Sequence, residues 1–156
     1  MASHMQRQPA RRPTIISSSD RFRLYALKPI DAATCWYDLE PKFADVVSRS
    51  LGRMSLESIR ENVVSGWWMV WTVWDDVGKN SRTWLLTELY TAPSGIKCWR
   101  IISCSGDDAD EWAHLIDEMK QAARAAGAQN FEMWARPGWQ KILGQRATHV
   151  LLEETL

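Results

Sequence analysis

One short stretch of the sequence combines the residue types that proteins use to bind an anion. Ile96 to Cys104 has the composition of a strand, and a turn containing Gly106 leads from it into an amphipathic helix that begins near Asp110. Free backbone N–H groups at such a helix start bind phosphate in many α/β proteins. Here the turn also holds Asp107 and Asp108, whose charges would repel a phosphate.

A second chemical candidate is Glu88, which falls in the predicted strand from Arg82 to Tyr90. Trp84 and Leu86 share its face of that strand. A carboxylate surrounded by apolar side chains is suited to accept a proton as a general base. The structural alternative is that Glu88 pairs with Arg100 on the neighbouring strand.

Three further polar positions have weaker patterns. Arg136 ends a predicted strand and begins the run Arg136-Pro137-Gly138-Trp139. It could contact an anion or a protein, or the run is a rigid turn with Trp139 in the core. His114 lies on the polar face of the predicted helix and is expected to be solvated. His149, in a predicted last strand from Thr148 to Leu152, has no acid or nucleophile at a defined spacing.

The three cysteines, Cys35, Cys98 and Cys104, show no Cys-x-x-Cys spacing and no histidine at ligand spacing. This pattern indicates reduced thiols in the cytoplasm and argues against a disulfide framework or a metal site. Cys98 and Cys104 are an even number of residues apart on one predicted strand, so both are expected on the same face of the sheet.

Composition narrows the functional classes. The formal net charge is zero, which disfavours a nucleic-acid-binding surface, and no apolar run is long enough to span a bilayer. Met1 to Met5 resembles an expression-vector remnant, and residues 6–20 have the composition of a disordered basic tail. The sequence is rich in tryptophan, with ten residues, for which core filling is favoured over a ligand cage.

Hydrophobic patterning predicts one layered α/β domain in residues 21–156. Trp67 to Trp74 is apolar on both alternating faces, so its strand must be covered on both sides. Short turns join it to the next two strands as an antiparallel meander. The helix from Asp110 to Ala126 should then cross over to a parallel strand, Phe131 to Arg136. Nearer the N-terminus we expect a strand in residues 21–30 and three helices that begin at Asp31, Pro41 and Ser55.

This order of elements resembles that of the GNAT N-acetyltransferase family, over about Arg21 to Leu156. The second half, including Arg136-Pro137-Gly138-Trp139, is similar to small GNAT-like proteins of tailed bacteriophages. The resemblance implies a mixed, mostly antiparallel sheet flanked by helices on both faces. It also implies that the third meander strand and the strand after the long helix splay apart, and that acetyl-CoA enters the wedge between them.

The resemblance also assigns residues to the cofactor and to catalysis. It implies that Glu88 is the general base. The residues expected to hold the cofactor are Ile102, Ser103, Cys104, Ser105 and Gly106, with Arg136 as a further candidate. The family's phosphate-loop pattern is Gln/Arg-x-x-Gly-x-Gly/Ala, of which this chain keeps only Gly106. The position at which many relatives carry a tyrosine acid falls near Leu143.

Three functions remain open from the sequence. The chain could be an acyl-CoA-dependent N-acetyltransferase acting on an unknown amine acceptor. It could instead be a non-catalytic GNAT-fold accessory or assembly protein of a phage, with a phage or host protein as partner. The third hypothesis is an interaction module that takes a peptide strand into the wedge of the sheet.

Overall fold

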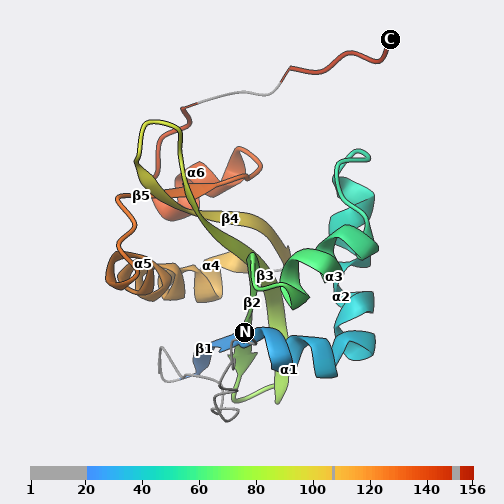
Figure 1. Ribbon diagram of the computed structural model, residues 1–156. Coiled ribbons are helices and arrows are strands. Elements are labelled where there is room, and N and C mark those ends of the chain that lie inside the picture. Colours follow the sequence, from blue (N-terminus) through green and yellow to red (C-terminus); the bar gives the residue numbers. More distant parts are fainter. Residues whose placement is uncertain (1–20, 107, 149–151) are drawn as a thin grey trace, which may run out of the picture.

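The computed structural model describes residues 21–106, 108–148 and 152–156 (Figure 1). The predicted tail of residues 1–20, Asp107, His149 and the middle of the predicted strand at residues 148–152 lie outside this part. The described strands form one sheet in the order β1-β2-β3-β4-β5, antiparallel throughout except for the parallel pair β4 and β5. The α/β class and the mixed, mostly antiparallel sheet are therefore confirmed.

The chain builds these elements in the predicted order. The strands are β1 (Phe22–Leu27), β2 (Trp68–Asp75), β3 (Asn80–Thr91), β4 (Lys97–Gly106) and β5 (Asn130–Met133). The helices are α1 (Pro29–Thr34), α2 (Trp36–Arg49), α3 (Leu56–Val64), α4 (Ala109–Trp112), the 3-10 turn η1 (Ala113–Leu115), α5 (Ile116–Ala125) and α6 (Gly138–Leu143). None of these helices is long and apolar enough to cross a membrane.

Helices cover the sheet on both sides (Figure 1). On one face, α4, η1 and α5 pack their apolar side chains, among them Trp112 and Met119, against Trp71 and Leu85 of the sheet. On the other face, α1, α2 and α3 close a second apolar cluster over the sheet. Strand β2 contributes to both clusters, as its two-sided apolar pattern predicts.

The helix that we expected to begin at Pro41 begins earlier, at Trp36, so that Pro41 lies inside α2. A proline there removes the hydrogen bond to the carbonyl of residue 37. Tyr37 is 84% exposed, so water can reach that part of the helix. Leu39 and Phe43, buried on either side of the proline, hold both halves of α2 against the sheet. Packing therefore outweighs the local preference for a break.

The long amphipathic segment is helical from Ala109 to Ala125, but η1 interrupts it. The tighter winding coincides with the burial of Ala113, a residue outside the predicted apolar stripe. His114 within the same turn is exposed, as predicted. The third helix starts as expected, because the side-chain oxygen of Ser55 accepts a hydrogen bond from the backbone N–H of Ser58 at 3.0 Å.

A β-bulge in β4 changes which side chains share a face. Leu86 pairs with Ser103 and Thr87 pairs with Ile101, so Ile102 has no opposing residue in β3. The extra residue reverses the alternation beyond it. Cys98 therefore lies opposite Tyr90 on the face of α2 and α3, while Cys104 packs with the cluster under α4 and α5. The prediction that these two cysteines share a face is wrong for this reason.

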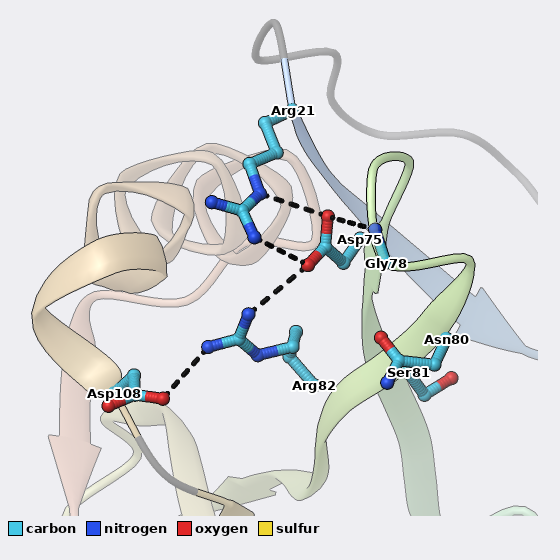
Figure 2. Close-up of a pocket in the computed structure, with 7 residues that line it drawn as sticks. All are labelled: Arg21, Asp75, Gly78, Asn80, Ser81, Arg82 and Asp108. Carbon is cyan, nitrogen blue, oxygen red and sulfur yellow. Dashed lines mark hydrogen bonds and ion pairs between the residues drawn. The ribbon is translucent and has the colours of Figure 1, made fainter.

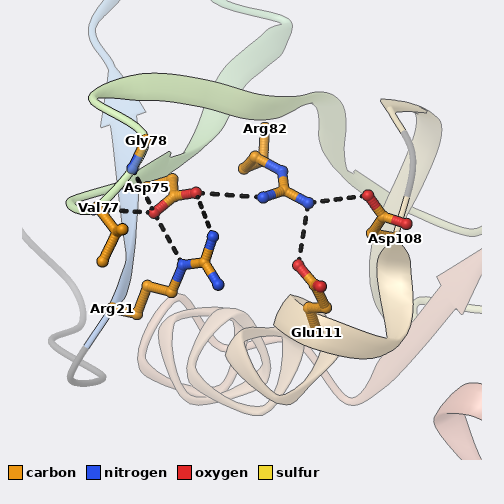
Figure 3. Close-up of polar contacts among 7 residues, drawn as sticks. All are labelled: Arg21, Asp75, Val77, Gly78, Arg82, Asp108 and Glu111. Atoms are coloured by element: carbon orange, nitrogen blue, oxygen red, sulfur yellow. Dashed lines mark hydrogen bonds and ion pairs between the residues drawn. The ribbon is translucent and has the colours of Figure 1, made fainter.

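A buried carboxylate fixes the start of the β2–β3 turn (Figure 3). Asp75 is 1% exposed and accepts hydrogen bonds from the guanidinium of Arg21 at 3.0 Å and from that of Arg82 at 3.1 Å. The backbone N–H groups of Val77 and Gly78 donate to the same carboxylate. The Arg21 hydrogen bonds, aided by these backbone donors and by Arg82, lower the pKa of Asp75 well below its usual range despite its burial.

We predict that Asp75→Asn lowers Tm by about 5 °C or more, because the amide leaves two arginines without their shared anion. Asp76→Asn is the matched control, since Asp76 pairs with Arg23 at the surface and contributes little. The difference in Tm between wild type and Asp75→Asn should have its full size above about pH 4 and shrink as the pH falls. The reason is that a carboxyl group whose pKa is lowered on folding stabilises the folded state only while it is ionised. Thermal unfolding from pH 7 to pH 3 measures this, and a difference that is independent of pH contradicts it.

Candidate functional site

The two parallel strands, β4 and β5, lie at one edge of the sheet and pair over only part of their length. Strand β5 pairs with β4 from Cys98 to Ile101 and ends at Met133, whereas β4 continues to Gly106. One further hydrogen bond, from the N–H of Trp134 to the carbonyl of Ile101 at 3.1 Å, marks the point of divergence. The predicted strand to Arg136 is thus shorter than expected, because the bulge at Ile102 turns β4 away from its neighbour.

A cavity of about 330 Å³ opens where the strands diverge. We call it the wedge cavity. Its walls come from the end of α2 with the loop after it, from β4, and from the segment that follows β5. The lining residues are Val46, Arg49, Ser50, Arg53, Met54, Ile102, Ser103, Cys104, Met133, Trp134, Ala135, Arg136 and Trp139.

The structure brings four of the predicted cofactor-binding residues to this cavity: Ile102, Ser103, Cys104 and Arg136. The other two are placed differently. Ser105 is buried, and its hydroxyl donates to the carbonyl of Trp84 at 3.3 Å. Gly106 pairs with Thr83 at the end of β4. Neither of these two residues lines the wedge cavity.

Two side chains on this stretch of β4 differ in their chemistry. The hydroxyl of Ser103 is buried and has no hydrogen-bond partner in the described part of the chain. A buried hydroxyl without a partner costs free energy unless a ligand or water satisfies it. Burial raises the pKa of the Cys104 thiol to about 11. The thiol is therefore protonated at neutral pH and is a poor nucleophile.

Glu88 does not line the wedge cavity. It belongs to a group of hydrogen-bonded polar side chains beside the cavity. Its carboxylate accepts hydrogen bonds from Arg100 at 3.0 Å and from the indole N–H of Trp68 at 3.2 Å. The predicted pairing of Glu88 with Arg100 is therefore confirmed. The guanidinium of Arg100 also stacks on the ring of Trp134 at 4.5 Å, and Trp134 lines the cavity. Two side chains, Arg100 and then Trp134, therefore connect Glu88 to the cavity.

Arg100 holds a second carboxylate on its other side. Its Nε donates to Glu132 at 3.0 Å, and its Nη2 donates to the Tyr90 hydroxyl at 2.6 Å. Tyr90 in turn donates to Glu132 at 2.8 Å. Burial and the hydrogen bond to Glu132 raise the pKa of Tyr90 to about 12. Burial works against ionisation of Glu132, but its hydrogen bonds with Tyr90 and Arg100 lower its pKa overall. Tyr90 is thus a neutral donor and Glu132 an ionised acceptor.

A second cavity, of about 400 Å³, lies beyond the C-terminal end of β4, near the start of α4 (Figure 2). Arg21, Arg82, Asp75 and Asp108 are among its lining residues. Its arginines are already paired, since Arg21 and Arg82 bind Asp75, and Arg82 also binds Asp108 and Glu111, both at 2.9 Å. This cavity is therefore a structural polar cluster, and its described residues offer no unpaired cation to a ligand.

Sequence patterns did not reveal the role of Arg82. It precedes the acids of the helix start by some 26 residues in the chain, and only the sheet brings them together. These ion pairs neutralise part of the negative charge at Asp108 and Glu111. From the sequence alone, no cation could be assigned to these two acids. Asp108 also adopts a left-handed conformation, with φ of 55°, to begin α4.

Other chemical groups in the described residues are not clustered. Within residues 21–106, 108–148 and 152–156, no group of three or more histidine, cysteine, aspartate or glutamate side chains could hold a metal ion. The cysteines Cys35, Cys98 and Cys104 are free thiols. Trp139, predicted as a possible core residue, packs against Trp112 with ring centroids 5.8 Å apart.

Comparison with known proteins shows similarity in structure but not in sequence. No protein-family model matches the chain, and no curated protein matches it significantly. A solved structure of a probable acetyltransferase superposes with a TM-score of 0.62 at 16% identity, covering 86% of this chain and 96% of that one.

Two further solved structures, both of acetyltransferases, are similar in fold. An aminoglycoside acetyltransferase, meta-AAC0020, from an uncultured soil metagenomic sample, solved with sisomicin, gives a TM-score of 0.61 at 12% identity, covering 88% of this chain and 97% of that one. Ribosomal-protein-alanine N-acetyltransferase from Brucella melitensis biovar Abortus 2308 gives 0.58 at 12% identity, covering 86% and 99%. Identities this low establish the fold alone, and that fold is the one of the GNAT acetyltransferases.

Proposed function

We propose that the chain is an acyl-CoA-dependent N-acetyltransferase that holds its cofactor in the wedge cavity. One observation carries the proposal: the cavity opens where β4 and β5 diverge, and Ile102, Ser103, Cys104 and Arg136 line it. The GNAT resemblance assigns Ile102, Ser103 and Cys104 to cofactor binding, and the sequence indicates Arg136 as a possible anion contact. The acyl-CoA would supply an activated thioester: an amine attacks its carbonyl carbon, the C–S bond breaks, and CoA leaves as a thiolate that water can protonate.

The backbone of β4 offers donors for such a ligand. From Ile102 onward, no described strand pairs with the β5-facing edge of β4. N–H groups on that edge suit the carbonyl oxygen of a thioester and the amide groups of a pantetheine arm. The unpartnered hydroxyl of Ser103 is a further donor or acceptor at the same place.

The phosphate end of the site departs from the family's pattern. Gly106 is the only glycine of the loop motif, and Asp108 and Glu111 flank the helix start. Arg82 binds both carboxylates and so reduces the repulsion that a pyrophosphate would meet. The side chain of Arg136 has no ion pair in the described residues and is the cation we assign to the cofactor phosphates. We therefore expect weaker cofactor binding than a complete loop motif gives.

We assign the general base to Glu88. Its carboxylate takes the proton that the acceptor's ammonium group must lose before the nitrogen can attack the thioester carbonyl. Because Glu88 does not line the cavity and Arg100 and Trp134 lie between, the proton would pass from the acceptor amine to Glu88 through bridging water. Arg100 and Trp68 fix the carboxylate through hydrogen bonds at 3.0 and 3.2 Å.

One observation favours a non-catalytic protein as the second candidate. Leu143, which occupies the expected position of the family's tyrosine acid, packs against the apolar cluster under α5. It cannot protonate a leaving thiolate. In this alternative the fold serves as an accessory or assembly module, with a phage or host protein or a peptide in the wedge.

Thermal unfolding with acetyl-CoA separates the two candidates. A ligand at 100 times its Kd adds about 2.7 kcal/mol to the stability, which should raise Tm by roughly 5–10 °C for a domain of this size. Ala135→Trp places an indole at the exposed mouth of the cavity and should abolish the shift. Ala125→Trp, on the exposed end of α5, is the matched control and should keep it. Absence of any shift at millimolar acetyl-CoA contradicts the enzyme, and an equal shift in Ala135→Trp contradicts this location.

A pair of isosteric substitutions tests the base. Glu88→Gln and Glu132→Gln each remove one carboxylate partner of Arg100, but only the first removes the proposed base. With an amine that the wild type acetylates, Glu88→Gln should lower kcat by roughly 100-fold or more while the Kd for acetyl-CoA stays unchanged. Glu132→Gln should keep most of the activity. Equal losses in both variants would show that Glu88 only positions Arg100.

A further inference from the structure

We propose that the acceptor of this acetyl transfer is an amine on an acidic peptide, and that Arg49 and Arg53 at the wedge cavity bind the peptide's carboxylates beside Arg136, the cation assigned to the cofactor phosphates. We call Arg49, Arg53 and Arg136 the arginine rim. The inference rests on the proposed function, because it names the substrate class for the same cavity.

The charge of the cavity lining is one-sided. Among the described residues, the lining contains the three rim arginines and no aspartate, glutamate or lysine. They come from three separate parts of the chain: Arg49 from the last turn of α2, Arg53 from the loop after it, and Arg136 from the segment after β5. Such an arrangement favours an anionic ligand and opposes a cationic one.

The rim arginines are available for a ligand. Arg136 is exposed, and no described residue forms an ion pair with its side chain. Arg49 pairs within its own helix with Asp45, which is 63% exposed. Ion pairs at such exposure are weak and exchange readily with a competing carboxylate.

The chain itself supplies an example of the proposed contact. Glu153, in the described C-terminal segment 152–156, accepts a hydrogen bond from Nη2 of Arg53 at 3.0 Å. Both side chains are nearly half exposed, at 46% and 45%, so a ligand can displace the pair. A glutamate of the chain's own C-terminal segment thus already reaches the rim at Arg53.

The remainder of the lining suits the rest of a peptide. Trp134, Trp139 and Met54 offer apolar surface beside the arginines. The buried Ser103 hydroxyl, which lacks a partner in the described residues, offers a polar contact at the β4 wall. The lining therefore combines anion recognition at its edge with apolar and hydrogen-bonding contacts farther in.

Competing peptides test the inference. The C-terminally amidated peptides Ala-Glu-Glu-Ala, Ala-Gln-Gln-Ala and Ala-Arg-Arg-Ala each carry one primary amine, and mass spectrometry measures their acetylation from acetyl-CoA. The acidic peptide should have a kcat/KM at least about tenfold above the neutral one, and the basic peptide the lowest. Arg53→Gln should remove most of the preference through KM. Arg60→Gln, an exposed arginine of α3 outside the cavity, should leave it intact.

Binding without catalysis separates this inference from the proposed function. N-acetylated Ala-Glu-Glu-Ala cannot react, and calorimetric titration measures its Kd in the absence of acetyl-CoA. Binding that weakens roughly tenfold in Arg53→Gln supports the acidic site even if no peptide is acetylated. Acetylation with no preference for acid keeps the function and overturns the inference. A loss of acetyl-CoA affinity in Arg53→Gln, with peptide binding unchanged, would assign Arg53 to the cofactor phosphates and also overturn it.

Glu153→Gln provides a test in the opposite direction. Removing this carboxylate frees Arg53, so the acidic peptide should bind roughly two- to fivefold more tightly than to the wild type. Glu154→Gln, the neighbouring exposed residue, is the control and should have no effect. Unchanged or weaker binding in Glu153→Gln would show that Arg53 does not bind the peptide's carboxylates.

Discussion

The divergence of two parallel strands is the constraint on which the candidate site depends. Strands β4 and β5 share hydrogen bonds only as far as Ile101 and Met133, and the bulge at Ile102 then turns β4 away. Without this divergence, backbone hydrogen bonds would close the sheet and leave no cavity between the strands. The helices on both faces provide the packing that holds the open sheet in this shape.

Two arginine-centred clusters stabilise the sheet on either side of the wedge cavity. Arg82 joins Asp75, at the β2–β3 turn, to the acids that begin α4. Arg100 joins Glu88 of β3 to Glu132 of β5 across the intervening strand. Each guanidinium holds more than one carboxylate, which its planar array of donors permits. The rim arginines differ from Arg82 and Arg100 in their partners. Arg49 and Arg53 pair with carboxylates of exposed surface residues, and Arg136 has no carboxylate partner among the described residues.

Local patterns predicted most of the fold. The two-sided apolar run around Trp71 placed β2 inside the layers, and the capping residue Ser55 located the start of α3. The bulge at Ile102 could not be predicted, because Ile102 and Ser103 suit either register of a strand. Pro41 misplaced a helix boundary, since tertiary packing of α2 outweighed the local break. The link from Arg82 to Asp108 depends on sheet topology, which no local pattern contains.

Amide hydrogen exchange with and without acetyl-CoA tests the central claim most directly, namely that the divergence of β4 and β5 forms the cofactor site. Bound cofactor should slow exchange in two segments, Ile102 to Ser105 and Trp134 to Arg136, because these flank the wedge cavity. Exchange in the β3–β4 hairpin at Ala92 to Ile96 should not change. Protection confined to residues outside the wedge, or no protection at saturating acetyl-CoA, would contradict the account.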